Sequence, residues 1–131
     1  MPSVAVVGAS TKVERYSHQA VLRFAARGYQ VWPVHPSGQA VAGHACYRSL
    51  AELPGRPDVV TMYVNSEAGL ELVEAIVQAG PRLVILNPGA DGPALLAALH
   101  GRGLTAIEAC SLVLLAQGDP LTLAGVQPGT R

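Results

Sequence analysis

The stretch "SVAVVG", residues 3–8, is a short and unbroken apolar run that ends in a glycine. Such a run is typical of a β-strand that is buried on both faces. A polar loop follows, and apolar side chains then recur at helical spacing, with Ser17 as the expected N-cap and Gly28 just past the helix end. The beginning of the chain therefore predicts a strand, a loop and a helix.

Four more apolar runs follow, and stretches of helical spacing separate most of them. Helices in these positions make right-handed crossovers between parallel strands. The sequence therefore predicts an α/β fold, a doubly wound, Rossmann-like parallel sheet in three layers with helices on both faces. The expected strands occupy residues 3–8, 29–34, 58–64, 82–87 and 104–109.

The remaining helices and turns are predicted from local signals. Ser66 is the expected cap of the helix after the third strand, and Pro93 lies near the start of the helix after the fourth. The segment 36–57 fits the alternation less well. It contains one short possible strand near Val41 and a possible helical turn at residues 49–53.

Length and composition predict a single domain, residues 1–131, with residues 119–131 as a loosely held tail rich in glycine and proline. Nine basic and nine acidic side chains give a formal net charge of zero. We therefore expect neither nucleic acid nor an anionic membrane surface as a partner. Because no apolar run is long enough to span a bilayer and no signal peptide is recognisable, we expect a cytoplasmic protein. A homo-oligomer is one alternative for its assembly.

The loop after the first strand has the features of a phosphate-binding site. Ligands of open parallel sheets lie beyond the carboxyl ends of the strands, and Gly8 permits a tight turn there. The hydroxyls of Ser10 and Ser17, the charges of Lys12 and Arg15 and the N–H groups of the following helix would all favour an anion. The alternative is that Gly8 only ends a strand and that both cations are solvated surface residues.

The loop does not match the dinucleotide fingerprint. The three glycine positions of that motif are occupied here by Gly8, Ser10 and Val13. The second strand ends in His35 and Pro36, without the carboxylate that binds the ribose of NAD. Both NADP and coenzyme A therefore remain open.

The sequence resembles the small stand-alone coenzyme A-binding proteins, whose fold is similar to the nucleotide-binding domain of the succinyl-CoA synthetase α subunit. The resemblance runs from about residue 3 to residue 118 and rests on segments in a fixed order. They are "VAVVGAST", "ERYSHQAVLRFAARGYQVWPVHP", "VAGHACYRSLAELP", "PDVVTMYVNSEAG", "ILNPGA" and "AIEACSLVLL". Many relatives carry an aromatic–basic pair where this chain has "YVN".

The resemblance implies the position of coenzyme A along the strand ends. Its pyrophosphate would face the loop from Gly8 through Ala9 to Ser10, with Lys12 or Arg15 near a phosphate. The adenosine would lie beside His35 and Pro36. The resemblance further places four residues along the pantetheine side, namely Asn65, Asn87, Gly89 and Cys110.

Catalysis and metal binding have little support in the sequence. The four histidines, at positions 18, 35, 44 and 100, lack metal-ligand spacing, and the synthetases that share the fold use additional domains for phosphoryl transfer. We therefore expect non-catalytic binding of coenzyme A or acyl-CoA. The alternatives are an NADP-linked or other nucleotide-using enzyme and an interaction module. Cys110 is either an inert buried thiol or a partner for the coenzyme thiol in a mixed disulfide.

Overall fold

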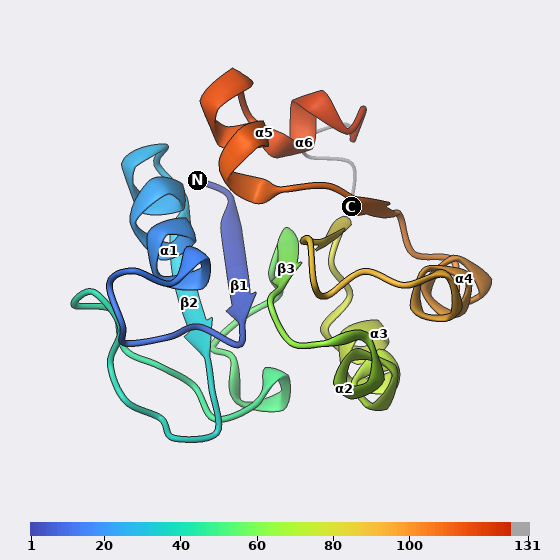
Figure 1. Cartoon of the computed structure of the whole chain (residues 1–131), viewed down its shortest axis with the longest axis horizontal. Coiled ribbons are helices and arrows are strands. Elements are labelled where there is room, and N and C mark those ends of the chain that lie inside the picture. Colours follow the sequence, from blue (N-terminus) through green and yellow to red (C-terminus); the bar gives the residue numbers. More distant parts are fainter. Residues whose placement is uncertain (127–131) are drawn as a thin grey trace.

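Five parallel strands form one sheet within residues 1–126, the part of the chain that the computed structural model describes (Figure 1). Their spatial order is β2-β1-β3-β4-β5. The chain builds the sheet outward from β1 in both directions, so the strand order reverses between β1 and β3. The predicted doubly wound α/β fold is therefore confirmed. The strands are β1 (Ser3–Val7), β2 (Gln30–Val34), β3 (Val59–Met62), β4 (Leu83–Leu86) and β5 (Ala106–Glu108).

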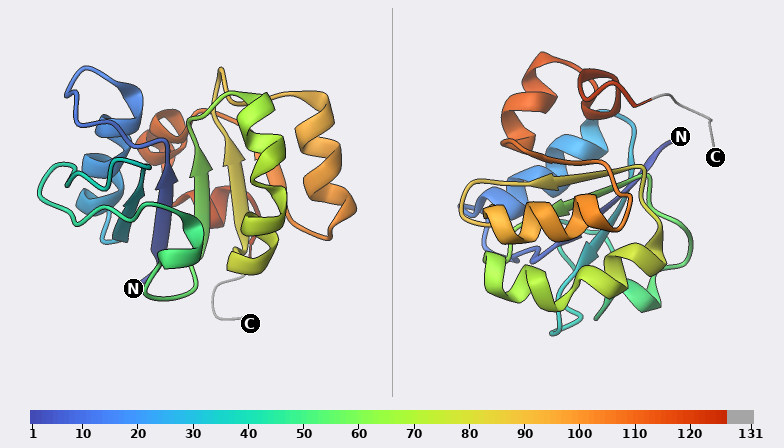
Figure 2. Two further views of the ribbon diagram at one scale, coloured as in Figure 1. Left: turned by 90° about the horizontal axis from the view of Figure 1, so that it is seen from below. Right: turned by 90° about the vertical axis from the view of Figure 1, so that its right-hand side faces the viewer.

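Helices cover both faces of the sheet and complete the three layers (Figure 2). On one face lie α1 (Tyr16–Ala26), α5 (Ser111–Gln117) and α6 (Pro120–Leu123). On the other lie the 3-10 helix η1 (Leu50–Glu52), α2 (Ser66–Glu71), α3 (Val73–Ala79) and α4 (Pro93–Gly101). Among residues 1–126, no helix has both the length and the apolar character needed to cross a membrane.

The double cover explains the unbroken apolar run of β1. Val4 and Val6 belong to the core under α1 and α5, whereas Ala5 and Val7 belong to the core under α3 and α4. All five residues of β1 are buried. Because side chains of a strand alternate between the two faces, a strand with a helical layer on each side needs apolar residues at every position.

Two helix starts differ from the prediction. Arg15, not Ser17, occupies the N-cap position of α1, and it makes no side-chain capping bond. Ser17 lies inside the helix, and its hydroxyl accepts a hydrogen bond from the Ser10 N–H at 3.1 Å. The hydroxyl therefore binds the preceding loop and does not cap the helix. At α2 the cap is Asn65 instead of Ser66, and its side chain accepts from the Ala68 N–H at 2.9 Å.

The expectation of a loosely held tail was wrong for the described part of that segment. The Asp119 carboxylate caps α6 by accepting from the Leu121 N–H at 2.9 Å, and it also accepts from the Tyr29 hydroxyl at 2.6 Å. Leu121 is buried in the core under α1. Local composition contains no information on such long-range contacts. A prediction based on glycine and proline content therefore could not include them. Residues 127–131 of the predicted tail lie outside the described residues.

The segment between β2 and β3 returns to the end of β2. The Tyr47 N–H donates to the Pro33 carbonyl, and the His35 N–H donates to the Tyr47 carbonyl, both at 2.9 Å. The possible strand at Val41 is only a single bridge to His44, whereas the predicted helical turn is confirmed as η1. The pairing of Tyr47 fixes the following residues beside the carboxyl end of β2.

Candidate functional site

The point at which the strand order reverses brings Gly8 and the segment after β3 together. The carboxyl ends of two such strands flank a crevice that commonly holds a ligand in α/β folds. Gly8 has a positive φ of +86°, and a Cβ built on it would lie 3.1 Å from Val64 Cγ1 and 3.2 Å from the Tyr63 carbonyl carbon. The position therefore requires glycine, both for its backbone angle and for its close approach to β3.

Hydrogen bonds fix the loop that follows Gly8. The N–H groups of Gly8 and Ala9 donate to the Val34 carbonyl at 2.9 and 3.3 Å. The carbonyl of Ser10 lies 2.9 Å from His18 Nδ1, and because a carbonyl only accepts, this histidine nitrogen carries the proton. His18 is buried. It was not predicted as a site residue, and its place on the inner face of α1 is the only signal for it.

The first turn of α1 offers three backbone donors. Among the described residues, the N–H groups of Tyr16, Ser17 and His18 have no acceptor. Free N–H groups and the helix dipole at this end favour an anion, the dipole alone by roughly 0.3–1 kcal/mol. The start of α1 therefore has donors that an anion could occupy.

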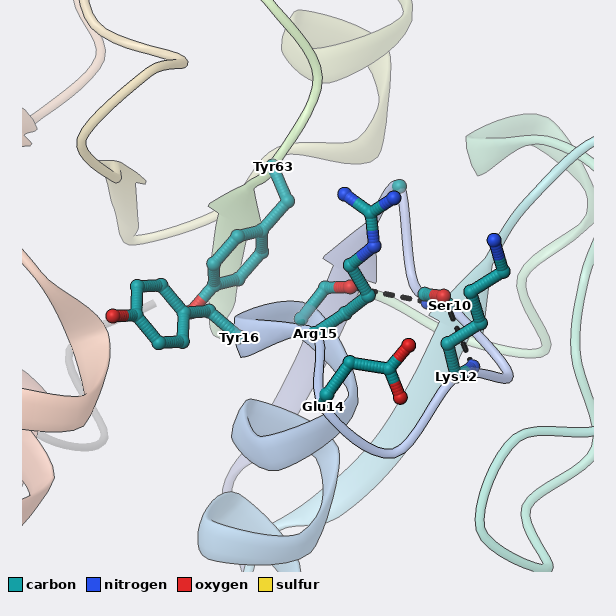
Figure 3. Close-up of a pocket in the computed structure, with 8 residues that line it drawn as sticks. Ser10, Lys12, Glu14, Arg15, Tyr16 and Tyr63 are labelled. Carbon is teal, nitrogen blue, oxygen red and sulfur yellow. Dashed lines mark hydrogen bonds between the residues drawn. The ribbon is translucent and has the colours of Figure 1, made fainter.

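A cavity of about 450 Å³ lies at the start of α1 (Figure 3). Lys12 and Arg15 line it with exposed side chains, which extend to the same side of the loop in Figure 3. Neither side chain forms an ion pair with a carboxylate of residues 1–126, although Glu14 lines the same cavity. Their positive charges are therefore available to a ligand that carries phosphate groups.

A second cavity, of about 500 Å³, adjoins the first and shares Gly8 and Tyr63 with it. Most of its lining is apolar, and it extends from the end of β2 to α2 and α3. A third cavity of about 210 Å³ lies between Lys12 and His35. The structure thus brings the predicted phosphate residues together at the first cavity and places His35 and Pro36 at the second. The second cavity has the apolar lining that suits an aromatic ring system with polar atoms along one edge.

The four residues predicted along the pantetheine side lie after β3, β4 and β5, but they line none of these three cavities. Asn65 is exposed and uses its side-chain oxygen to cap α2. Gly89 is exposed in a turn, where its N–H donates to the Asp91 carboxylate at 3.1 Å. The other two members of this group are Asn87 and Cys110, which belong to a polar cluster between β3, β4 and α5.

Asn87 is 1% exposed and holds three elements together. Its side-chain nitrogen donates to Thr61 Oγ1 at 2.7 Å and to the Met62 carbonyl at 2.9 Å. Its side-chain oxygen accepts from the Ser111 N–H at 2.8 Å. Every donor and one acceptor site of this amide are thus used within the protein, so the side chain ties β3, β4 and α5 to one another.

Tyr63 connects the first cavity to this polar cluster. Its ring lines the cavity, whereas its hydroxyl is buried and makes no well-formed hydrogen bond within residues 1–126. The neighbouring hydroxyls of Thr61 and Ser111 bond to each other at 2.8 Å instead. Burial, and then the nearby Cys110 thiol, raise the pKa of Tyr63 to about 12. Cys110 itself is a free, half-buried cysteine at the start of α5, not a fully buried one.

Residues 2–116 match the family described as "CoA binding domain". The chain belongs to this CoA-binding domain family. Membership supports coenzyme A binding in general. The predicted resemblance to small coenzyme A-binding proteins is confirmed at the level of the family.

Similar proteins of known sequence and structure agree with this fold. The CoA-binding domain is 34% identical over 64 residues to the uncharacterized protein YneT of Bacillus subtilis, a match that covers 49% of this chain and 47% of YneT. The chain thus spans about half the length of the curated relative it matches. A conserved hypothetical protein from Pyrococcus furiosus superposes with a TM-score of 0.77 at 28% identity, over 87% of this chain and 99% of that protein.

A domain of a larger enzyme has the same fold. Acetyl-coenzyme A synthetase 1 of Ca. Korarchaeum cryptofilum superposes with a TM-score of 0.70 at 22% identity, over 80% of this chain and 25% of the synthetase. The CoA-binding domain therefore corresponds in fold to about a quarter of that enzyme.

Two residues that line the cavities of the present chain, Tyr63 and Arg48, were not predicted from the sequence. The sequence placed Tyr63 near the carboxyl end of the expected strand 58–64, which was the available signal, whereas no local pattern pointed to Arg48.

Proposed function

We propose that this protein binds coenzyme A, either free or acylated, with the pyrophosphate on the Gly8 loop and the start of α1. The observation that carries the proposal is the convergence of free donors with positive charge. The N–H groups of Tyr16, Ser17 and His18 are unpaired among the described residues, and Lys12 and Arg15 line the cavity at the same helix end. A pyrophosphate satisfies both features at once, because it accepts hydrogen bonds and carries negative charge.

The two ends of the coenzyme extend from the pyrophosphate in opposite directions. In the proposed orientation the adenine occupies the apolar cavity beside His35 and Pro36. The pantetheine arm passes the ring of Tyr63 toward Cys110 at the start of α5. Asn65 and Gly89 border this path, and Asn87 holds the strand ends that support it.

We propose that this binding is non-catalytic. Within residues 1–126 no histidine is hydrogen-bonded to a carboxylate, so a preformed acid–base pair has no support there. No group of three or more metal-binding side chains occurs in the same part of the chain. The polar side chains closest to the strand ends bond to one another and serve the sheet.

An NADP-linked enzyme is the second candidate function. It is favoured by one observation, the absence of an acid after β2, where His35 and Pro36 stand. NADP and coenzyme A both carry a phosphate on the adenosine ribose, and neither would be repelled at this position.

Isothermal titration of the purified protein with coenzyme A, acetyl-CoA, NADP and NAD tests the proposal. We expect coenzyme A and acetyl-CoA to bind and both nicotinamide dinucleotides to bind far more weakly. At 100 times its dissociation constant, a specific ligand also stabilises the folded protein by about 2.7 kcal/mol, which a thermal-shift measurement detects. Binding of NADP alone would favour the second candidate, and the absence of binding by all four would contradict both.

A further inference from the structure

Arg48 is a cation that the structure brings to the adenosine end of the proposed site. The pairing of Tyr47 with Pro33 and His35 carries the chain back to the carboxyl end of β2, and Arg48 is the next residue. Its side chain lines the apolar cavity together with His35, Pro36 and Gly8. A positive charge thus stands where a Rossmann-type fold places the ribose of an adenine nucleotide.

Internal contacts hold the Arg48 side chain in place. Its Nη1 donates to the Pro36 carbonyl at 2.9 Å. Its side chain also covers Gly38, since a Cβ built on that glycine would lie 3.2 Å from Arg48 Cζ and Nε. A guanidinium that is fixed before a ligand arrives loses little conformational entropy when it binds one.

The charge of Arg48 is not neutralised by the protein. The residue is exposed, and it forms no ion pair with a carboxylate within residues 1–126. Glu71 lines the same cavity but does not reach the guanidinium. One N–H group bonds to Pro36, so the rest of the guanidinium can donate to a phosphate in bidentate geometry.

We propose that Arg48 binds the 3′-phosphate of coenzyme A and thereby selects coenzyme A over dephospho-CoA. The proposal rests on the proposed function, because it assumes that the adenosine occupies the cavity at the end of β2. Lys12 is the rival cation, since it lines the small cavity beside His35. Lys12 also lines the cavity at the start of α1, and its ammonium group makes no hydrogen bond or ion pair among the described residues, so we assign it to the pyrophosphate.

Titration with coenzyme A and dephospho-CoA tests this role of Arg48. If Arg48 donates hydrogen bonds to the charged 3′-phosphate, the wild-type protein should bind coenzyme A roughly 10- to 100-fold more tightly than dephospho-CoA. In Arg48→Gln we expect this ratio to fall to about one, through loss of coenzyme A affinity at unchanged dephospho-CoA affinity. Arg48→Lys should retain part of the ratio, since it keeps the charge but not the bidentate geometry.

Arg23→Gln is the matched control, because Arg23 lies in the last turn of α1 and lines none of the three cavities at the strand ends. The variant removes the same charge and should keep the wild-type ratio. An unchanged ratio in Arg48→Gln, or its collapse in Lys12→Gln alone, would overturn the role of Arg48 and leave coenzyme A binding intact. The affinity ratio of NADP to NAD could also exceed the affinity ratio of coenzyme A to dephospho-CoA. That result would assign Arg48 to the 2′-phosphate of NADP and overturn the choice of coenzyme A. Absence of coenzyme A binding by the wild type would instead reject the proposed function.

Discussion

Gly8 lies directly against Val64, the second residue after β3, so that a Cβ on Gly8 would come within 3.1 Å of Val64 Cγ1. The contact joins the loop after β1 to the strand beside it. The sequence predicts that Gly8 permits a tight turn close to a ligand, with the alternative that it only ends the strand. The structure adds that a side chain at this position would strain the protein itself.

Gly8→Ala should therefore lower both stability and coenzyme A affinity. The positive φ and the close contact together predict a loss of about 1–3 kcal/mol in the free energy of unfolding. Gly28→Ala is the matched control, since Gly28 has a φ of +89° but nothing within 4 Å of its Cβ position. Urea unfolding of both variants measures the difference. Equal losses of stability would show that the contact with Val64 contributes nothing.

The two cations of the loop should govern affinity through charge. We expect Lys12→Gln combined with Arg15→Gln to weaken coenzyme A binding by roughly 10- to 100-fold, since each cation would contact a phosphate. Both side chains are exposed, so the wild-type affinity should fall as the salt concentration rises, and the double variant should respond less. Titrations in low and high KCl measure this. A double variant with wild-type affinity would remove both residues from the site.

Replacement of Asn87 by alanine should lower the stability of the protein more than replacement of Asn65. Asn87→Ala leaves the buried Ser111 N–H without its acceptor and removes the amide donor to Thr61 Oγ1 and the Met62 carbonyl, which predicts a loss of about 2–4 kcal/mol. Asn65→Ala removes only the exposed cap of α2, which costs about 1 kcal/mol. Thermal and urea unfolding of both variants provide the comparison. Equal effects would contradict the central structural role of Asn87.

Tyr63→Phe should stabilise the protein and flatten its pH dependence. The variant removes a buried hydroxyl that lacks a well-formed hydrogen bond among residues 1–126, a gain of roughly 1 kcal/mol at neutral pH. Burial raises the pKa of Tyr63 from 10.0 to about 12, so the folded protein holds this proton more tightly than the unfolded chain. This difference in proton affinity contributes fully to the free energy of unfolding below pH ~10. The contribution is lost as the pH rises toward 12, and the loss amounts to roughly 2–3 kcal/mol.

Unfolding of Tyr63→Phe and wild type between pH 8 and pH 12 measures this difference. Tyr29, whose pKa is also raised by burial and by its hydrogen bond to Asp119, remains in both proteins. Its titration therefore cancels in the comparison. A variant that loses stability with pH as steeply as the wild type would contradict the role of Tyr63.

The central strands could be predicted from the sequence because they are covered on both faces. β1, β3 and β4 are runs of buried residues, and such runs need no knowledge of their neighbours. Ser17 shows the limit of local signals: it has the residue type of a helix cap, but its hydroxyl accepts from Ser10 instead. Arg48 reaches the site only because Tyr47 pairs with β2, a contact that no local pattern encodes.

Cys110 should form a mixed disulfide with coenzyme A if the pantetheine arm passes Tyr63. The thiol is free and half-buried at the start of α5, and it helps to raise the pKa of Tyr63, whose ring lines the cavity at α1. With coenzyme A disulfide as the oxidant, the Cys110 thiolate attacks one sulfur. The S–S bond of the reagent breaks, a protein–coenzyme disulfide forms, and one coenzyme A thiolate leaves.

Intact-protein mass spectrometry after this incubation should show one coenzyme A adduct that a reductant removes. Cys46 is the internal control, because burial raises the pKa of its thiol and so lowers the reactive thiolate fraction. We expect the adduct to persist in Cys46→Ser and to disappear in Cys110→Ser. Excess acetyl-CoA, which has no free thiol and so cannot reverse the exchange, should slow its formation, since the reaction would depend on an occupied site and not only on an exposed thiol. An adduct confined to Cys46 would place the coenzyme thiol near the end of β2, reversing the proposed orientation of the ligand.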